Sequence, residues 1–172
     1  MDAFDHDMEL ETNSPKRKLL SMFIVDDNIA YITLLKDKFL QKGIYEINTF
    51  TSGEECLENL NLKPDIVVLD YHLTDENSKG LDGHQVLEII MQKLPRTKVI
   101  MISGDEKIQL LSSDFDSLGA SNSLLKSYDT ATKIKVISNE LIEKRNRKHA
   151  FIVFLSLLVL LSIVIAIVNF FY

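Results

Sequence analysis

The stretch PDIVVLDYH, residues 64–72, decides the fold. Ile66 to Leu69 are apolar without interruption, and the run ends on a carboxylate, Asp70. A strand with no polar residue in its middle is covered on both faces, as in a parallel sheet between two layers of helices. In such sheets ligands bind at the carboxyl ends of the strands. The stretch therefore predicts a buried central strand that delivers Asp70 to a shared crevice.

Further stretches predict the other strands and the helices between them. Apolar runs at residues 19–25 and 98–103 predict buried strands, and shorter strands are expected at 45–50 and 121–126. Helical spacing and helix-starting residues predict helices at 28–41, 52–60, 84–94, 106–118 and 129–148. Strand and helix thus alternate along the chain. We expect an α/β fold, a doubly wound five-stranded parallel sheet with helices on both faces.

The overall composition argues against several classes of protein. The chain has 172 residues and a net charge of −6, which argues against nucleic acid as a partner because phosphate binding needs a basic face. The single cysteine, Cys56, cannot form an internal disulfide, so we expect a reducing compartment and interpret Cys56 as a small buried hydrophobic residue. Residues 1–17 are acidic, and we expect a disordered tail there rather than a signal peptide.

The C-terminal part has the composition of a membrane span. Residues 150–168 carry no charge, and their only polar residues are Ser156 and Ser162. A helix of this length is about 28 Å long, close to the roughly 30 Å hydrocarbon thickness of a bilayer. A helix at the surface of a soluble core would show a polar stripe, and this segment has none. We expect one transmembrane helix at 150–170 that acts as an anchor.

A basic juxtamembrane segment, residues 144–149, precedes the span. It contains Lys144, Arg145, Arg147 and Lys148. Basic flanks stay on the cytoplasmic side, so we expect a single-pass protein of the inner (cytoplasmic) membrane with its folded part in the cytoplasm. Topology alone accounts for this cluster. Attraction to anionic lipid headgroups would be an added effect that needs no dedicated site.

Polar side chains gather at the carboxyl ends of the predicted strands. They are Asp26 and Asp27, Asp70, Ser103 and Lys126. Three carboxylates would repel one another, and a hard divalent ion such as Mg²⁺ relieves this because it takes oxygen ligands. A nucleophilic carboxylate beside a metal, an ammonium and a hydroxyl suits an aspartyl phosphate. Singly, the acidic pair could cap a helix and the lysine could be solvated, but together they favour a site.

Five motifs resemble the receiver domain of two-component response regulators: IVDDN, DIVVLDYHL, LDGHQVLEII, VIMISGDE and GASNSLLKSY. The resemblance covers residues 18–143 and implies a flavodoxin-like sheet of order 2-1-3-4-5. It implies that Asp70 accepts a phosphoryl group from a histidine kinase or a histidine phosphotransfer protein. It also implies that Asp26 and Asp27 hold Mg²⁺, aided by Asp70 and the main-chain carbonyl of His72.

The same resemblance gives roles to three residues that follow the later strands. Ser103 and Lys126 would contact the phosphoryl group, and Gly104 matches the small residue that keeps the site open. A receiver catalyses only its own phosphorylation and dephosphorylation, so we do not expect a separate enzyme activity.

Three features depart from the usual receiver pattern. The loop after Asp70 contains an extra polar stretch at 75–79, which is either a tolerated insertion or an element that changes access to the phosphoryl group or selects the partner kinase. Ser127 stands where receivers usually have a proline with a cis bond, so a trans bond after Lys126 is favoured. Ser123 replaces the aromatic switch residue, and we interpret Tyr128 as a packing residue rather than a replacement.

These observations predict a membrane-tethered, single-domain receiver that signals to an unidentified downstream protein through protein–protein contacts. One alternative is a phosphate-independent adaptor that keeps the receiver fold as a binding module. Another is a hydrolase, because DYHLT at 70–74 partly resembles the haloacid-dehalogenase signature. His72 replaces the second aspartate of that signature, which removes the expected general acid.

Overall fold

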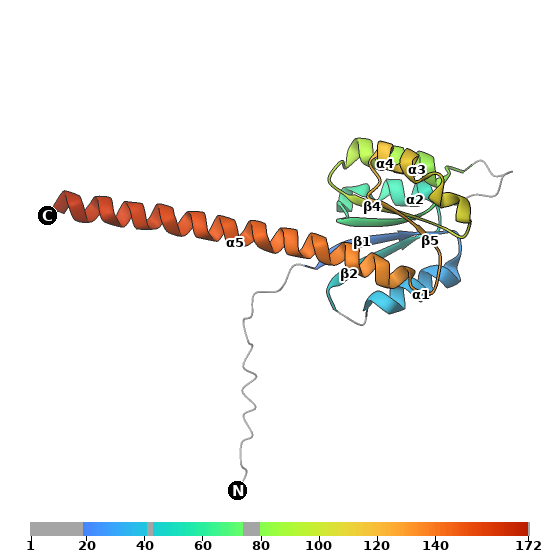
Figure 1. Cartoon of the computed structure of the whole chain (residues 1–172), viewed down its shortest axis with the longest axis horizontal. Coiled ribbons are helices and arrows are strands. Elements are labelled where there is room, and N and C mark those ends of the chain that lie inside the picture. Colours follow the sequence, from blue (N-terminus) through green and yellow to red (C-terminus); the bar gives the residue numbers. More distant parts are fainter. Residues whose placement is uncertain (1–18, 41–42, 74–79, 172) are drawn as a thin grey trace, which may run out of the picture.

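The computed structural model describes residues 19–40, 43–73 and 80–171 (Figure 1). The predicted tail at 1–17 and the polar stretch at 75–79 lie outside the described residues. The strands are β1 (Leu20–Val25), β2 (Tyr45–Phe50), β3 (Ile66–Asp70), β4 (Lys98–Ser103) and β5 (Asn122–Leu125). The α-helices are α1 (Ile29–Leu40), α2 (Gly53–Glu58), α3 (Gly83–Lys93), α4 (Ser112–Leu118) and α5 (Thr130–Phe171). Two short 3-10 helices cover Leu60–Leu62 and Glu106–Gln109.

The five strands form one parallel sheet of order β2-β1-β3-β4-β5, which confirms the predicted doubly wound α/β fold. Every residue of β3 is buried, as its apolar run predicts. In the register, Val25 lies beside Leu69 and Asp70 lies beside Ile102. The carboxyl ends of β1, β3 and β4 therefore meet at one edge, where the predicted site residues follow.

Helices cover both faces of the sheet. Figure 1 shows α2, α3 and α4 on one side and α1 with the first part of α5 on the other. Neighbouring residues of β1 point to opposite sides: Phe23 belongs to the first core cluster and Ile24 to the second. Phe115 of α4 packs in the first cluster, and Phe39 and Ile134 in the second. Cys56 is fully buried in the first cluster, which confirms its interpretation as a core residue.

Side-chain caps fix where two helices begin. The Asn28 side chain accepts a hydrogen bond from the Tyr31 N–H at 3.1 Å and so starts α1 at the predicted place. Asp82 and Gln85 form a reciprocal capping box at the start of α3, in which each side chain accepts from the other residue's N–H. Both caps lie at the edge where the strands end, so they hold the loops that surround the predicted site.

Two predicted helices differ in detail. The helix expected at 106–118 is split into the 3-10 helix Glu106–Gln109 and α4. The Asp105 side chain caps the first piece by accepting from the Lys107 N–H at 2.9 Å, and two buried anchors, Ile108 and Phe115, hold the pieces separately. The helix expected to reach residue 60 ends at Glu58 and continues as a 3-10 turn.

The last helix, α5, runs without a break for 42 residues. Its first part packs on the sheet, and the core clusters include no residue beyond Ile142 among those described. Residues 150–171 are exposed throughout and extend away from the domain (Figure 1). By length and composition α5 is a candidate membrane span. Because the core is complete before residue 143, we expect residues 1–148 to fold without the apolar segment.

Candidate functional site

Three strands bring an ammonium against two carboxylates. Lys126 follows β5, and its Nζ lies 2.8 Å from Oδ2 of Asp70 at the end of β3. The same Nζ lies 2.7 Å from Oδ2 of Asp26, which follows β1. Asp26 is fully buried and Asp70 nearly so, and the Lys126 side chain is about one-fifth exposed, at 19%. The predicted constellation is therefore assembled around a lysine that bridges two buried acids.

Electrostatics hold this lysine in its charged form. Burial alone would lower the pKa of the Lys126 ammonium, but the contacts with Asp26 and Asp70 outweigh burial and raise that pKa. The Tyr31 ring adds a third contact, because Lys126 Nζ lies 4.8 Å from the ring centroid. A permanent positive charge thus stands beside Asp70.

Asp70 has an unusual affinity for a proton or a cation. Burial raises the pKa of Asp70 to about 6, and the neighbouring Asp26 charge adds to this against the opposing effect of Lys126. Its Oδ1 atom is buried and accepts no hydrogen bond from the residues that the structure describes. A buried carboxylate oxygen without a partner is costly unless another group occupies it. Asp70 is therefore suited to take a further electrophile or cation.

The carboxylates of Asp26, Asp27 and Asp70 fit a divalent ion. One oxygen from each lies within 4.8 Å of the others, with Asp27 exposed and the other two buried. Asp26 Oδ1 is engaged by the Asn28 N–H at 3.0 Å. Asp27 and the unpartnered Oδ1 of Asp70 thus complete an all-oxygen donor set of the kind that Mg²⁺ prefers.

The remaining predicted residues lie at the same edge. Ser103 ends β4 fully buried, and its Oγ accepts from the Asp105 N–H at 3.1 Å. Gly104 is exposed, and a Cβ there would meet no atom within 4 Å, so the chain is open at this point. The His72 side chain is exposed, stacked edge-on against Tyr71 with ring centroids 4.8 Å apart. The metal-binding role of the His72 carbonyl stays a prediction.

Hydrogen bonds shape the loop that carries the lysine. The described peptide bonds include no cis bond, so the bond between Lys126 and Ser127 is trans, as the serine favours. Thr130 is buried, and its Oγ1 donates to the Leu125 carbonyl at 3.0 Å and accepts from the Ser127 N–H at 2.7 Å. These bonds close the loop in place of a proline. The interpretation of Tyr128 as a packing residue is wrong: its side chain is 93% exposed, and the Lys38 ammonium lies over its ring at 4.7 Å from the centroid.

Two site residues were not predicted. Tyr31 lies in the first turn of α1, and its ring reaches Lys126 because α1 and the loop before α5 meet in the fold. Gly83 opens α3, and a Cβ built there would lie 2.1 Å from the Asp70 carbonyl oxygen. The signal for Gly83 was a glycine directly after the capping Asp82, inside a motif that resembles receivers.

The fold and this acidic edge together define a doubly wound α/β domain with a cluster of carboxylates at its strand ends, and comparison with known proteins identifies its family. The model of the response regulator receiver domain matches residues 22–138. The chain therefore belongs to the response regulator receiver domain family.

Three relatives place the chain within that family. It is 33% identical over 86 residues to the chemotaxis protein CheY of Listeria monocytogenes, covering 49% of this chain and 68% of the relative. It is 33% identical over 85 residues to a protein-glutamate methylesterase/protein-glutamine glutaminase of Archaeoglobus fulgidus, covering 49% of this chain and 23% of the relative. The receiver domain of NtrX from Brucella abortus superposes with a TM-score of 0.61 at 26% identity, covering 71% of this chain and 98% of that one.

The extent of these matches limits what they carry over. The chain spans only about a quarter, 23%, of the Archaeoglobus methylesterase. The solved receiver domain, by contrast, is covered almost entirely. The shared part is the receiver, and the family agrees with the observed strand order.

Proposed function

We propose that this receiver accepts a phosphoryl group on Asp70 from a phosphohistidine donor, with Mg²⁺ as cofactor. The observation that carries the proposal is the lysine bridge: Lys126 Nζ lies 2.8 Å from Asp70 and 2.7 Å from Asp26. The donor is a histidine kinase or a histidine phosphotransfer protein. In the transfer, an Asp70 oxygen forms a bond to phosphorus, the phosphorus–nitrogen bond breaks, and the imidazole nitrogen takes the electron pair.

Each residue has a part in this reaction. Asp26 and Asp27, with Asp70, would hold Mg²⁺, which when bound neutralises charge on the phosphoryl oxygens. Lys126 contributes a positive charge beside Oδ2 of Asp70, and this charge stabilises the transferring group. Ser103 donates its hydroxyl hydrogen to a phosphoryl oxygen, because the bond that its Oγ accepts from the Asp105 N–H uses only a lone pair.

The apolar half of α5 anchors the receiver in a membrane. The support is a helix in which residues 150–171 are exposed and whose length and composition suit a span. The basic residues before it favour a cytoplasmic receiver at the inner membrane. Tethering confines the receiver to the surface where membrane kinases lie and raises its effective concentration for them. Phosphorylation then alters contacts with a downstream protein.

Intact-mass analysis tests phosphoacceptance directly. Residues 1–148 are incubated with acetyl phosphate with and without Mg²⁺, beside Asp70→Asn and an exposed acidic control, Asp116→Asn. We expect one phosphoryl addition that needs both Mg²⁺ and Asp70 and that the Asp116→Asn control retains. A folded chain that gains no phosphoryl group would favour a phosphate-independent adaptor instead.

A further inference from the structure

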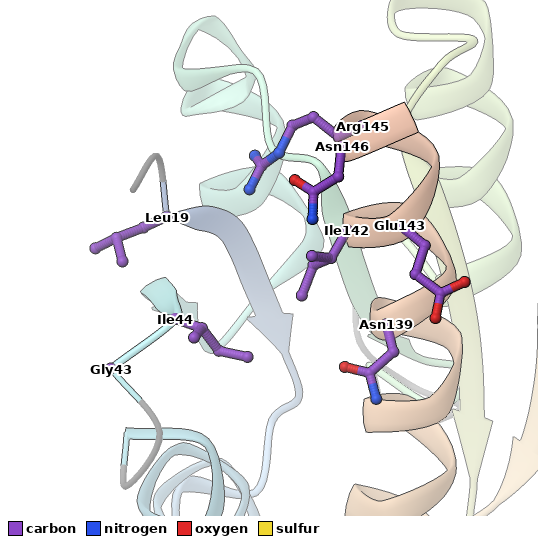
Figure 2. A pocket seen from close by; sticks show the side chains of 8 residues that line it. All are labelled: Leu19, Gly43, Ile44, Asn139, Ile142, Glu143, Arg145 and Asn146. Atoms are coloured by element: carbon purple, nitrogen blue, oxygen red, sulfur yellow. The ribbon is translucent and has the colours of Figure 1, made fainter. Parts of the chain in front are cut away.

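The opposite edge of the sheet, where the strands begin, carries a second polar feature. Residues 139–146 of α5 lie there against Leu19, just before β1, and Ile44, just before β2 (Figure 2). On the other side of the helix, Lys144 and Lys148 face Lys98 at the start of β4 across a second cavity. The edge that meets the departing helix therefore has two pockets, one on each flank of α5.

The second cavity is strongly basic. It has a volume of about 580 Å³, and five of the residues that line it are cationic while none is acidic. The five are Arg96, Lys98, Lys144, Arg145 and Lys148. Two of them, Arg96 just before β4 and Lys98 at its start, lie about fifty residues earlier in the chain than the helical three. In a chain of net charge −6, this concentration of one sign is a built feature rather than an average surface.

The neighbouring pocket shows that basic lining is not general at this edge. Figure 2 shows Asn139 and Asn146, two neutral amides, and the pair Glu143 and Arg145 around that cavity of about 530 Å³. One acid there offsets one base, so the pocket has no preference for an anion. Of the two cavities that flank α5, the one lined by Arg96 and Lys98 has the uncompensated positive charge.

Most of the basic side chains in the cavity are available for a ligand. Within the described residues, no ion pair engages Arg96, Lys98, Lys144 or Lys148. An adjoining cavity of about 470 Å³ shares Arg96 and adds Lys63 before β3 and Lys93 at the end of α3, against one acid, Asp65. The positive surface therefore continues around the edge from the helix.

The height of the cavity along α5 identifies the ligand. Lys148 is three residues before Phe151, the second residue of the apolar segment, which is about 4.5 Å along a helix. With the apolar segment in a bilayer, the cavity lies at the level of the lipid headgroups. We propose that this cavity binds the phosphate of an anionic phospholipid headgroup, an inference that rests on the proposed membrane anchor.

Arg96 and Lys98 distinguish this site from the ordinary basic flank of a span. A basic flank that only sets topology would need the basic residues of α5 alone. A composite site needs Arg96 and Lys98 as well. Each basic residue near an anionic surface contributes about a factor of five in affinity. We therefore expect Arg96→Gln with Lys98→Gln to weaken lipid binding roughly tenfold or more.

The experiment uses the full chain in neutral detergent. Phosphatidylglycerol or phosphatidylcholine is titrated in, and the bound lipids are counted by native mass spectrometry, with glycerol phosphate as the soluble anion. The pocket variant is compared with Lys36→Gln and Lys107→Gln, a pair with the same loss of charge outside the cavity. Mg²⁺-dependent phosphorylation of Asp70 checks that each variant is folded.

We expect the wild-type chain and the Lys36/Lys107 control to retain phosphatidylglycerol over phosphatidylcholine, and the pocket variant to lose that preference. Unchanged retention by the pocket variant would overturn the composite site, and equal affinity for glycerol phosphate would overturn the lipid assignment. Carbonate extraction of membranes separates the two proposals. A chain that is released by carbonate lacks the anchor, and a chain that stays embedded without lipid preference lacks only the pocket.

Discussion

Gly83 packs its α-carbon against the backbone of the proposed phosphoacceptor. We predict that Gly83→Ala lowers the stability of residues 1–148 by about 1–3 kcal/mol, because a Cβ would lie 2.1 Å from the Asp70 carbonyl oxygen and rigid backbone must shift. The displaced strand end should also slow phosphorylation of Asp70. Urea unfolding and intact mass measure the two effects.

Gly104 is the matched control for that substitution. A Cβ at Gly104 meets no atom within 4 Å, so Gly104→Ala should leave the urea midpoint within error of wild type. Equal losses in both variants would show that backbone freedom, rather than the contact with Asp70, explains the effect at Gly83.

The raised pKa of Asp70 gives stability a definite pH dependence. Because the folded pKa is about 6 and the unfolded value is near 3.9, the folded state holds this proton more tightly. The contribution of Asp70 to folding stability is therefore largest below about pH 4 and decreases as the pH rises to about 6. In metal-free buffer near pH 7.5, the free energy of unfolding of Asp70→Asn should exceed that of wild type by about 1–3 kcal/mol. The gap should narrow near pH 4.5 in urea titrations, and a pH-independent gap would contradict this origin.

The buried thiol of Cys56 should be unreactive in the folded protein. Burial raises the pKa of its thiol to about 12, and the side chain is fully buried. Since the thiolate is the reactive form, a disulfide reagent such as dithionitrobenzoate at about pH 8 should label the native chain only as fast as it unfolds. Immediate labelling of the native protein, against full labelling in urea, would contradict this.

At the residue level, the sequence allowed prediction of site residues that directly follow a strand. It did not allow prediction of site residues that reach the site through contacts between elements. Asp26, Asp70 and Lys126 each follow a readable strand, so their meeting follows from parallel topology. Tyr31 and Gly83 depend on how closely a helix approaches another element, which no local pattern records. Tyr128 was misread for the same reason, since only the folded loop shows that it faces solvent.

At the level of elements, the loop from β5 to α5 tests whether hydrogen bonds replace the missing proline. Thr130→Val keeps the shape of the side chain and removes its bonds to the Leu125 carbonyl and the Ser127 N–H. We expect a loss of about 0.5–1.5 kcal/mol in stability, because two partly buried backbone groups lose their hydrogen-bond partner. Phosphorylation by acetyl phosphate should slow as Lys126 loses its fixed position. An unchanged rate would mean that the lysine is held by Asp26 and Asp70 alone.

The strands were more predictable than the helices. Continuous apolar runs gave β3 and β4 within a residue or two, since burial on both faces leaves few other readings. The region 106–118 is polar and weakly periodic, so its division into a 3-10 turn and α4 is decided by where Ile108 and Phe115 enter the core. The sequence pattern does not show that Ile108 and Phe115 are buried as parts of two separate helices.

For the whole molecule, the division of α5 into a packed part and an exposed part predicts independent stability of the receiver. Removing residues 149–172 should leave the urea midpoint of the receiver unchanged relative to the full chain in neutral detergent, because the described core clusters include no residue beyond Ile142. The midpoint is followed by circular dichroism near 222 nm after subtraction of the signal of the span. A lower midpoint in the shortened chain would show that the span supports the fold.

The continuous helix α5 also sets the distance between the acidic site and the proposed membrane surface. The helix begins at Thr130, beside the loop that carries Lys126, and reaches Lys148 about 27 Å further along its axis. With the apolar part embedded, Asp70 lies at a similar distance from the lipid surface, because the continuous helix fixes that spacing. For the proposed phosphotransfer, a donor histidine would have to reach Asp70 at about that distance from the lipid surface, which restricts the partners that can dock.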